Sequence, residues 1–506
     1  MNIVSLPFFL FVAAVLAAYY LVPKRFQWVV LLLSSILFYC SYGWWKIAFL
    51  LAPSLVSYGC GRSIQRIQQQ NSANDAKKKS KPVCTLGVVA VLALLLYAKA
   101  GSLLLRALDN IIQPANPSVW IVVSLGVSYY SFSLISYIVD VYRRRDEAEQ
   151  DFFRFLLYAI YFPKVLQGPI VKHRTIRDAL FSEHRFQPRV CLRGLERMLW
   201  GYFKKLVIAD RLSLLLNTVW GNVDSVSGPV VCYAAVCSVI QLYCDFSGCM
   251  DILGGISQCF MVELEKNFDH PFRSESAAEF WRRWHITLGE WFKDYVFRPL
   301  SLSKWLLDAA KKARASFGVS FSRTFTTAVP LLTVWILTGL WHNLRAEYLI
   351  WGLYWGVVIL AEYIIGMNTA RKKVGAERRS DGGGLRIWAK RCGVWLLFTV
   401  SRLLTAPGDF RTSLKAFSRL IVLNRSNLPV EELLGLNRAN MILVFLSTVC
   451  LFLVEHYDDA KGVHALLDRQ SMYRRLSFDF LFLLAVVIFG CYGMGYDPAA
   501  FVYMGY

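Results

Sequence analysis

The chain has 506 residues, of which 56% are hydrophobic, 15% aromatic and only 18% charged, and its mean hydropathy is +0.41. A soluble domain must expose more charge, so this composition excludes an ordinary soluble protein and indicates a membrane protein. The formal net charge of +21 could suggest a nucleic-acid partner. The basic residues stand in short loops beside apolar segments, however, which is the positive-inside pattern, so we expect no nucleic-acid partner.

Apolar segments recur along the whole chain, and a helix that crosses the hydrocarbon needs about 20 apolar residues. Candidate spans are residues 3–22, 27–42, 45–61, 83–98, 118–141, 152–168, 229–256, 324–341, 346–366, 392–406, 440–457 and 478–495. We expect some of them to be re-entrant or interfacial, and the first to be an uncleaved span because its basic residues follow it. The sequence thus predicts one all-α, multi-spanning membrane domain over residues 1–506.

The orientation of the spans is predicted from the basic loops. Two polar, basic linkers, residues 62–81 and 371–391, are expected to be flexible, and three consecutive arginines occupy positions 143–145. Placing these loops in the cytoplasm puts both the N-terminus and the C-terminus outside the cell.

Two long stretches are amphipathic rather than spanning. One is residues 190–216, and the other begins with a capping box, Ser276-x-x-Glu279, that predicts a helix start near Ala277. We expect this second helix to continue to Pro299 and to carry His285 on its apolar face, where neutral imidazole is favoured. A histidine in such a place is more often a satisfied core residue than a catalyst.

A second histidine, His342, follows 18 uncharged residues, 324–341. Ionisable groups at membrane depth are costly and suggest function, although a histidine that caps the helix end is an equal alternative. Thr338 and Gly339 would permit close approach of another helix. Two such histidines suggest general-base chemistry on a hydroxyl.

Other chemistries find little support in the sequence. It has no nucleophile elbow, P-loop or HExxH motif, and its 12 cysteines form no CxxC pair, so we expect no metal site and no permanently bound cofactor. The charged residues near the histidines and in the glycine-rich stretch are interpreted as structural; they are Arg283, Asp294, Asp245 and Asp251.

Six motifs, in order, resemble those of the membrane-bound O-acyltransferases, and within them the alginate O-acetyltransferase branch. They are "SYYSFSLISYIVDVYR" (128–143), "YFPKVLQGPIVKH" (161–173), "GYFKKLVIADRL" (201–212), "YCDFSGCMDI" (243–252), "NFDHPFRSESAAEFWRRWHITLGEWFKDYVFRPL" (267–300) and "TGLWHNLRAEYLIWGLYWG" (338–356). The resemblance implies a multi-helix membrane fold with a funnel to a buried site. It also implies that His342 is the catalytic histidine and His285 the second one.

The chain departs from the family pattern at a few positions. Asn343, Leu344 and Arg345 follow the "GLWH" histidine where a Gly-Ala pair is usual, and Thr287 and Gly289 interrupt the usual "RRWHISLS". Cys249 stands where an aromatic residue is common. These differences bear on the substrate more than on the reaction.

The last six residues, "FVYMGY", resemble a C-terminal tail of alginate-type relatives. The resemblance implies that Tyr503 accepts the acyl group and passes it to an extracytoplasmic acetyltransferase partner. A phenolic oxygen is a plausible temporary carrier because its low pKa makes it a better leaving group than an aliphatic alcohol. An aromatic anchor at the membrane interface is the alternative.

The sequence thus predicts an O-acyltransferase of the bacterial inner or plasma membrane. It would move an acyl group, which the resemblance implies is acetyl, from a cytoplasmic acyl-CoA or acyl-carrier thioester to a hydroxyl of an exported or cell-surface polysaccharide. Trp281, Trp284 and Trp341 would line the substrate path. The alternatives are D-alanyl transfer to teichoic acid and a lipid or polysaccharide transporter whose broken helix would lie at Gly248–Gly255.

Overall fold

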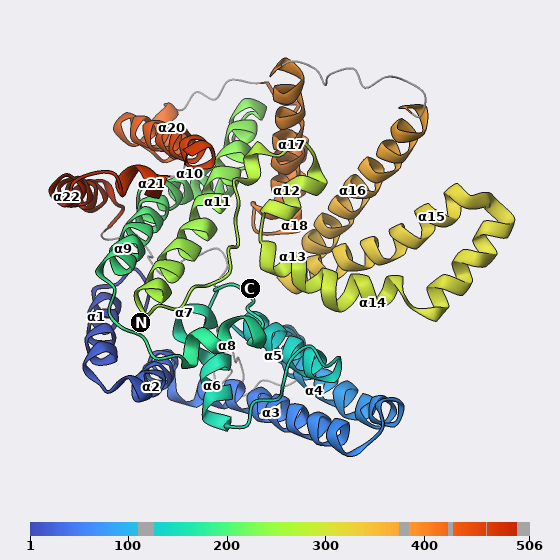
Figure 1. Ribbon diagram of the computed structural model, residues 1–506. Coiled ribbons are helices and arrows are strands. Elements are labelled where there is room, and N and C mark those ends of the chain that lie inside the picture. Colours follow the sequence, from blue (N-terminus) through green and yellow to red (C-terminus); the bar gives the residue numbers. More distant parts are fainter. Residues whose placement is uncertain (110–125, 374–383, 424–428, 462, 493–506) are drawn as a thin grey trace. The chain divides into compact units, whose positions relative to one another are not determined.

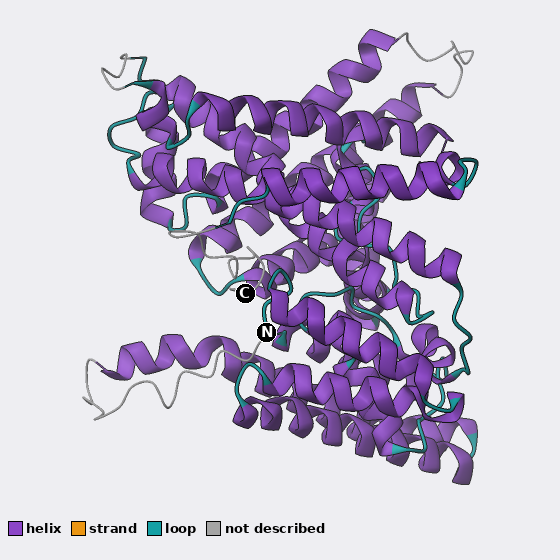
Figure 2. Ribbon diagram, turned by 90° about the vertical axis from the view of Figure 1, so that its left-hand side faces the viewer, coloured by secondary structure: helices purple, strands orange, loops and turns teal. Residues whose placement is uncertain are grey.

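The helices of the protein are defined by a computed structural model, which describes residues 1–109, 126–373, 384–423, 429–461 and 463–492. Each extended regular element in these ranges is a helix, and β-pairing within them is limited to one isolated bridge between Phe268 and Trp284 (Figure 2). The prediction of an all-α membrane protein is therefore confirmed.

The contacts divide the chain into two compact units. Described residues within Met1–Tyr202 and Gly248–Glu265 belong to the first unit, and those within Phe203–Ser247 and Lys266–Cys491 belong to the second. One of the points at which the chain passes from one unit to the other lies within the long helix α11 (Gly228–Cys259) (Figure 1).

The described residues of the first unit form eleven helices besides the C-terminal part of α11. In it α3, α4 and α5 pack against one another, and α2 packs against α6 and α7 (Figure 1). The helices are α1 (Leu6–Leu21), η1 (Lys24–Phe26), α2 (Gln27–Cys40), η2 (Trp44–Lys46), α3 (Ile47–Gln70), α4 (Ala73–Asp109), α5 (Val127–Tyr142), α6 (Phe152–Ile160), α7 (Phe162–Val165), α8 (His173–Phe181) and α9 (Pro188–Tyr202).

The second unit carries the two histidines singled out above. Its helices, besides the N-terminal part of α11, are the π-helix η4 (Phe203–Ala209), α10 (Asp210–Gly221), η5 (Pro271–Arg273), α12 (Ala277–Arg283), α13 (Ile286–Phe292), the π-helix η6 (Lys293–Phe297), α14 (Arg298–Ser301), α15 (Lys304–His342), α16 (Ala346–Lys373), α17 (Gly384–Thr405), α18 (Phe410–Arg419), α19 (Val430–Leu434), α20 (Arg438–Lys461), α21 (Val463–Leu467) and α22 (Met472–Phe489).

Six of the twelve predicted spans coincide with described helices that are long and apolar enough to cross a bilayer. They are Trp44–Gln70, Ala73–Ala100, Gly228–Cys259, Lys304–His342, Ala346–Met367 and Arg438–Asp458. Most of the other candidates are shorter helices: α1 has 16 residues and α2 has 14. At 1.5 Å per residue, 16 residues rise only about 24 Å, so the expectation of some partial spans agrees with the structure.

Two predicted segments are wrong in detail. Residues 152–168 do not form one span, because Tyr161, with φ −44° and ψ 114°, interrupts the chain between α6 and α7. The basic linker 62–81 is not a flexible loop, since α3 continues to Gln70 and α4 begins at Ala73. Its Gln, Lys and Ala residues are good helix formers, which outweighs their polarity.

The second basic linker is described only in part. Helix α16 continues to Lys373 and α17 begins at Gly384, so both ends of the predicted loop at 371–391 are helical. Residues 374–383 lie outside the described residues, as do residues 118–125 of the predicted span 118–141.

The glycine-rich segment Gly248–Gly255 is not a broken helix. Helix α11 runs through it without interruption, and its glycines instead contact α9 within the first unit. A Cβ atom on Gly255 would lie 2.3 Å from the Gly194 carbonyl oxygen, and one on Gly201 would lie 2.6 Å from that of Gly248. Close helix packing explains these glycines, so the transporter alternative loses the feature on which it depended.

Helix α15 is bent at Gly318, whose φ of 84° lies in the region that favours glycine. The two arms of the helix are joined by a hydrogen bond that Ser322 Oγ donates to the Ala310 carbonyl, 2.8 Å away. The arm after Gly318 contains the predicted span 324–341 and ends at His342, which it places at a helix terminus.

Candidate active site

His342 is the last residue of α15 and is 7% exposed. Its ring packs against two side chains of α16: the Trp351 ring centroid lies 5.3 Å away, nearly perpendicular, and the Tyr348 centroid lies 6.3 Å away. The imidazole is therefore held at a helix end inside an aromatic environment.

Two glycines fix the contact between α15 and α16. A Cβ atom on Gly339 would lie 2.2 Å from the Tyr348 carbonyl oxygen, and one on Gly352 would lie 2.4 Å from the Trp335 carbonyl oxygen. No side chain fits there, so the two backbones touch, as the sequence predicted for Gly339. This contact sets the position of His342 against α16.

His285 does not lie on the face of one continuous helix, so that prediction was wrong. Helix α12 begins at Ala277 as expected, and the Ser276 hydroxyl accepts from the Glu279 N–H at 3.1 Å. The helix then ends at Arg283, and His285 adopts a left-handed conformation with φ 48° and ψ 52°.

The helix is interrupted at this point because its backbone forms hydrogen bonds with the backbone of a neighbouring segment. Residue 269 N–H donates to the Arg283 carbonyl at 2.9 Å, and the Ile286 N–H donates to the Asn267 carbonyl at 3.0 Å. Trp284 thereby pairs with Phe268 in the isolated bridge. Helical order then resumes in α13, η6 and α14, and Pro299 lies in the first turn of α14 rather than ending the helix.

The tautomer of His285 follows from its contact with Asn267. Its Nδ1 lies 3.2 Å from Asn267 Oδ1, an oxygen that also accepts from the Thr287 N–H at 3.1 Å and the Thr287 hydroxyl at 3.0 Å. Because an amide oxygen can only accept, Nδ1 carries the proton and Nε2 carries the lone pair. Burial lowers the pKa of His285 to about 3, so the ring is neutral at physiological pH.

The structure brings His285 and His342 together around Trp341. The Trp341 centroid lies 5.9 Å from that of His285 and 4.9 Å from that of His342. Both imidazole rings therefore pack against the same indole ring. Phe246 of α11 covers another side of His285, with centroids 4.8 Å apart.

The other predicted path residues lie in the same aromatic cluster. Trp284 is 2% exposed, and its ring centroid lies 5.0 Å from that of Phe268. The Trp281 ring contacts indoles of α15 and α16, with centroids 4.8 Å from Trp335 and 5.1 Å from Trp355. A role for these tryptophans as walls of a substrate path stays a prediction.

Glu362 of α16 holds α12 in place, which sequence reasoning did not identify. Its carboxylate accepts from the Ala277 N–H at 2.7 Å and from the Ala278 N–H at 3.0 Å. A carboxylate at a helix N-terminus satisfies backbone donors and complements the helix dipole. An acidic residue deep within the apolar run 346–366 was the sequence signal for it.

A buried charged cluster next to Phe246 was also missed. Residues 190–216 were predicted to be amphipathic, yet Lys205 is 1% exposed and lies 2.6 Å from Asp245 Oδ1 and 2.8 Å from Asp210 Oδ1. Lys204 donates to Ser247 Oγ at 2.9 Å. The π-helix η4 supplies both lysines, and together they hold residues 245 and 247, which flank Phe246.

The remaining charged residues have structural partners, as interpreted. Asp251 lies 3.2 Å from Arg197 Nε, and Asp294 lies 2.7 Å from Arg298. Arg283 pairs with Glu279 at 3.0 Å. Tyr503, the predicted acyl relay, lies outside the described residues.

Comparison with known proteins places the chain in a family. The sequence profile of the membrane-bound O-acyltransferase family matches residues 113–405, a range that contains both histidines. A probable alginate O-acetylase of Pseudomonas aeruginosa is 31% identical over 369 residues, 72% of this chain and 66% of the relative.

Two further relatives differ in what their names say they act on. A probable alginate O-acetylase of Pseudomonas fluorescens is 29% identical over 88% of this chain and 80% of the relative. A teichoic acid D-alanyltransferase of Bacillus subtilis is 24% identical over 49% of this chain and 60% of the relative. The similarity to the alginate enzymes thus covers more of the chain.

Proposed function

Because the chain belongs to the membrane-bound O-acyltransferase family, and so is a multi-pass membrane O-acyltransferase, we propose that it transfers acetyl groups to hydroxyls of an exported or cell-surface polysaccharide. The donor in this proposal is a thioester on the cytoplasmic side, carried by coenzyme A or by a carrier protein. The observation that carries the proposal is the cluster of His285, Trp341 and His342 in one buried aromatic environment.

In the proposed reaction His342 is the general base. It takes the proton from the acceptor hydroxyl as the oxygen attacks the thioester carbonyl, the carbon–sulfur bond breaks, and the proton is returned to the leaving sulfur. The aromatic side chains around the imidazole limit water, which would otherwise compete as an acceptor.

Two roles are open to His285 in this reaction: orienting the acceptor or polarising the thioester carbonyl. Its tautomer favours the first. With Nδ1–H directed at Asn267, Nε2 is an acceptor that can bind the acceptor hydroxyl hydrogen, and it has no proton to donate to a carbonyl oxygen. The low pKa of His285, about 3, also disfavours the imidazolium that carbonyl polarisation would require.

The route of the acyl group to the outside is the second part of the proposal. With both termini outside the plasma membrane, Tyr503 in the C-terminal tail would take the acyl group and pass it to an extracytoplasmic acetyltransferase. The alternative acceptor, teichoic acid, is supported by the similarity to a D-alanyltransferase, but over only 49% of this chain.

The proposal is tested by acyl transfer in membrane vesicles that contain the full chain and its polysaccharide acceptor. We expect His342→Ala to abolish transfer from labelled acetyl-coenzyme A or acetyl carrier while the protein stays folded in the membrane. His456→Gln, a change in α20, is the matched control and should retain transfer. Equal activity of His342→Ala and wild type would contradict the assignment.

The relay is tested separately with the tail. We expect Tyr503→Phe to prevent acetylation of the external acceptor, because phenylalanine has no oxygen to carry the group, whereas Tyr506→Phe should have no effect. Unchanged acetylation in Tyr503→Phe would remove the relay and leave the interface anchor as its role. Transfer of D-alanine rather than acetate would favour the alternative.

A further inference from the structure

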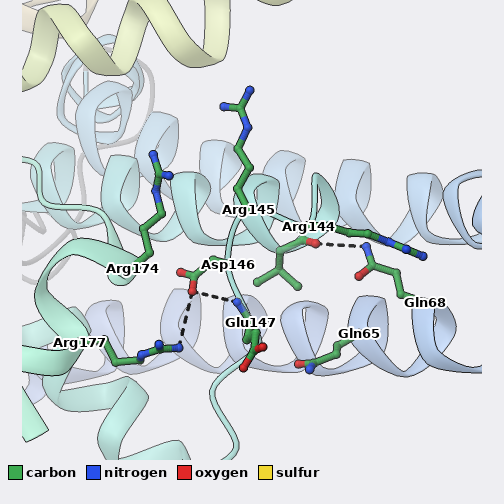
Figure 3. Close-up of a pocket in the computed structure, with 9 residues that line it drawn as sticks. Gln65, Gln68, Arg144, Arg145, Asp146, Glu147, Arg174 and Arg177 are labelled. Atoms are coloured by element: carbon green, nitrogen blue, oxygen red, sulfur yellow. Dashed lines mark hydrogen bonds and ion pairs between the residues drawn. The ribbon is translucent and has the colours of Figure 1, made fainter.

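An arginine-rich pocket of about 440 Å³ lies in the first unit, outside the histidine cluster (Figure 3). Its lining combines one face of α3, the C-terminal end of α5 with the loop that follows, and the first turns of α8. The lining residues are Gln65, Gln68, Val141, Arg144, Arg145, Asp146, Glu147, Arg174 and Arg177.

The framework of the pocket is held by backbone contacts. Gln68 Nε2 donates to the Val141 and Tyr142 carbonyls, both at 3.1 Å, and Gln65 Oε1 accepts from the Ala148 N–H at 2.8 Å. Arg144 has a φ of 57°, so the chain turns sharply between α5 and the loop. These contacts fix where the arginines leave the backbone.

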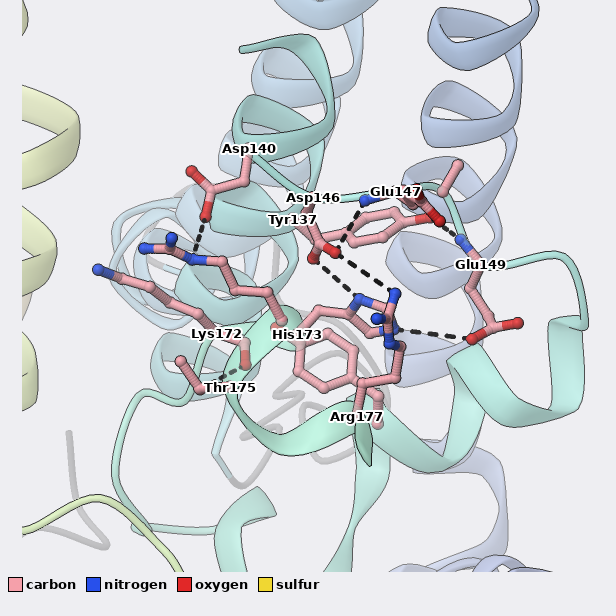
Figure 4. Close-up of polar contacts among 12 residues, drawn as sticks. Tyr137, Asp140, Asp146, Glu147, Glu149, Lys172, His173, Thr175 and Arg177 are labelled. Atoms are coloured by element: carbon pink, nitrogen blue, oxygen red, sulfur yellow. Dashed lines mark hydrogen bonds and ion pairs between the residues drawn. The ribbon is translucent and has the colours of Figure 1, made fainter. Parts of the chain in front are cut away.

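A buried histidine anchors the loop from the other side. The His173 side chain is fully buried, and its Nδ1 lies 2.9 Å from Asp146 Oδ2 (Figure 4). Its ring contacts those of Tyr137 and Tyr158, with centroids 5.2 and 5.0 Å away. This core gives the pocket a rigid base, since Asp146 itself is only 3% exposed.

Carboxylates pair with only two of the four arginines of the pocket. Asp146 is engaged by His173, and Arg177 reaches it only at 3.9 Å. Within the described part of the chain, Arg144 and Arg145 have no carboxylate within ion-pair distance. Outside the lining, Arg174 lies 3.6 Å from Asp140 and Arg177 lies 3.2 Å from Asp178. Arg144 and Arg145 therefore supply the guanidinium charge that the carboxylates around the pocket leave uncompensated.

We infer that this pocket binds a phosphate-bearing ligand. Guanidinium groups bind phosphate oxygens through paired, charge-assisted hydrogen bonds, and the volume falls within the range of small-molecule sites, about 300–1,000 Å³. The arginine loop 143–145 is one of the segments that the charge pattern places in the cytoplasm. The ligand is therefore either a soluble phosphorylated molecule such as coenzyme A, a source that rests on the proposed function, or the headgroup of an anionic phospholipid.

The experiment measures binding to the full chain in nanodiscs. In discs of neutral phosphatidylcholine, coenzyme A is titrated calorimetrically and inorganic pyrophosphate is used as competitor. In discs containing phosphatidylglycerol, the lipid retained after transfer to detergent is counted by native mass spectrometry. The double variant R144Q/R145Q is compared with Lys78→Gln, which removes an exposed charge from α4 that does not line the pocket.

A soluble ligand predicts that the double variant weakens coenzyme A binding by about tenfold or more, with pyrophosphate competing in the wild type. A lipid ligand predicts instead that the double variant loses retained phosphatidylglycerol and that coenzyme A does not bind. Equal behaviour of the double variant and Lys78→Gln in both measurements overturns the inference. Neither measurement requires turnover, so a His342→Ala variant that loses transfer but binds the phosphate probe separates this inference from the proposed function.

Discussion

The substitution Asn267→Leu removes the oxygen that sets the tautomer of His285 while keeping the side-chain volume similar. Asn267 is 3% exposed, and its Oδ1 accepts from His285 Nδ1, the Thr287 N–H and the Thr287 hydroxyl at 3.0 to 3.2 Å. The variant therefore loses three hydrogen bonds at one buried point. Only one of them involves the histidine.

The expected size of the effect differs between stability and activity. At about 1 kcal/mol per hydrogen bond, stability falls by roughly 3 kcal/mol, partly offset by the apolar leucine. The His285 bond alone is worth about 1 kcal/mol, or about fivefold in the ratio of the two neutral tautomers. The loss of ring orientation adds to this, so we expect acyl transfer to fall by about 10- to 100-fold, the range typical of orienting partners.

The assay compares initial rates of acyl transfer per folded molecule, with folded protein measured by size-exclusion chromatography in detergent. Thr287→Val is the matched control, because it removes one bond to the same oxygen but leaves the contact between Asn267 and His285. It should lose about 1 kcal/mol of stability and little activity. Equal rates for Asn267→Leu and Thr287→Val would refute the assignment of the tautomer to Asn267.

Three further outcomes are expected. Burial lowers the pKa of His285 to about 3, so below pH 6.5 the unfolded chain binds a proton at this residue and the folded chain does not. The stability of the fold is therefore unaffected by His285 protonation above pH 6.5, and it decreases as the pH falls from 6.5 toward 3. From pH 7 to 5 the loss is about 2 kcal/mol, and thermal unfolding should show a smaller loss in His285→Gln. Gly352→Val should lower both unfolding temperature and acyl transfer, because its Cβ would lie 2.4 Å from the Trp335 carbonyl oxygen; Gly366→Val, with open space around it, should lower neither. Lys205→Met should cost about 3–5 kcal/mol by leaving buried carboxylates without their cation, and a second change, Asp245→Leu, should recover part of the unfolding temperature; a lower temperature in the double variant would contradict this.

Much of the fold could be predicted from the sequence because the bilayer requires long apolar helices. The end of the span at His342 and the start of the next at Ala346 were placed within a few residues, and the capping box at Ser276 set the start of α12 correctly. These features depend on residues close together in the chain. Local periodicity and composition are sufficient to identify them.

The geometry around His285 depended on tertiary contacts and was predicted incorrectly. The aromatic spacing of residues 280–297 favours one helix, but backbone groups of Asn267 and residue 269, in the segment that precedes α12, interrupt it at His285. The burial of Lys205 was missed for a similar reason, since its partner Asp245 lies on another helix. Pairing with distant groups changed both the local backbone and the cost of burying charge.

The sequence alone determined that the chain is a helical membrane protein and which two histidines to examine. Only the tertiary structure decided that Trp341 lies against both imidazoles, that Asn267 sets the proton on His285, and that four arginines line one pocket. The physical reason is that hydrophobicity along the chain fixes which segments leave water. The chemistry of a buried polar group depends on whichever partner the fold brings to it.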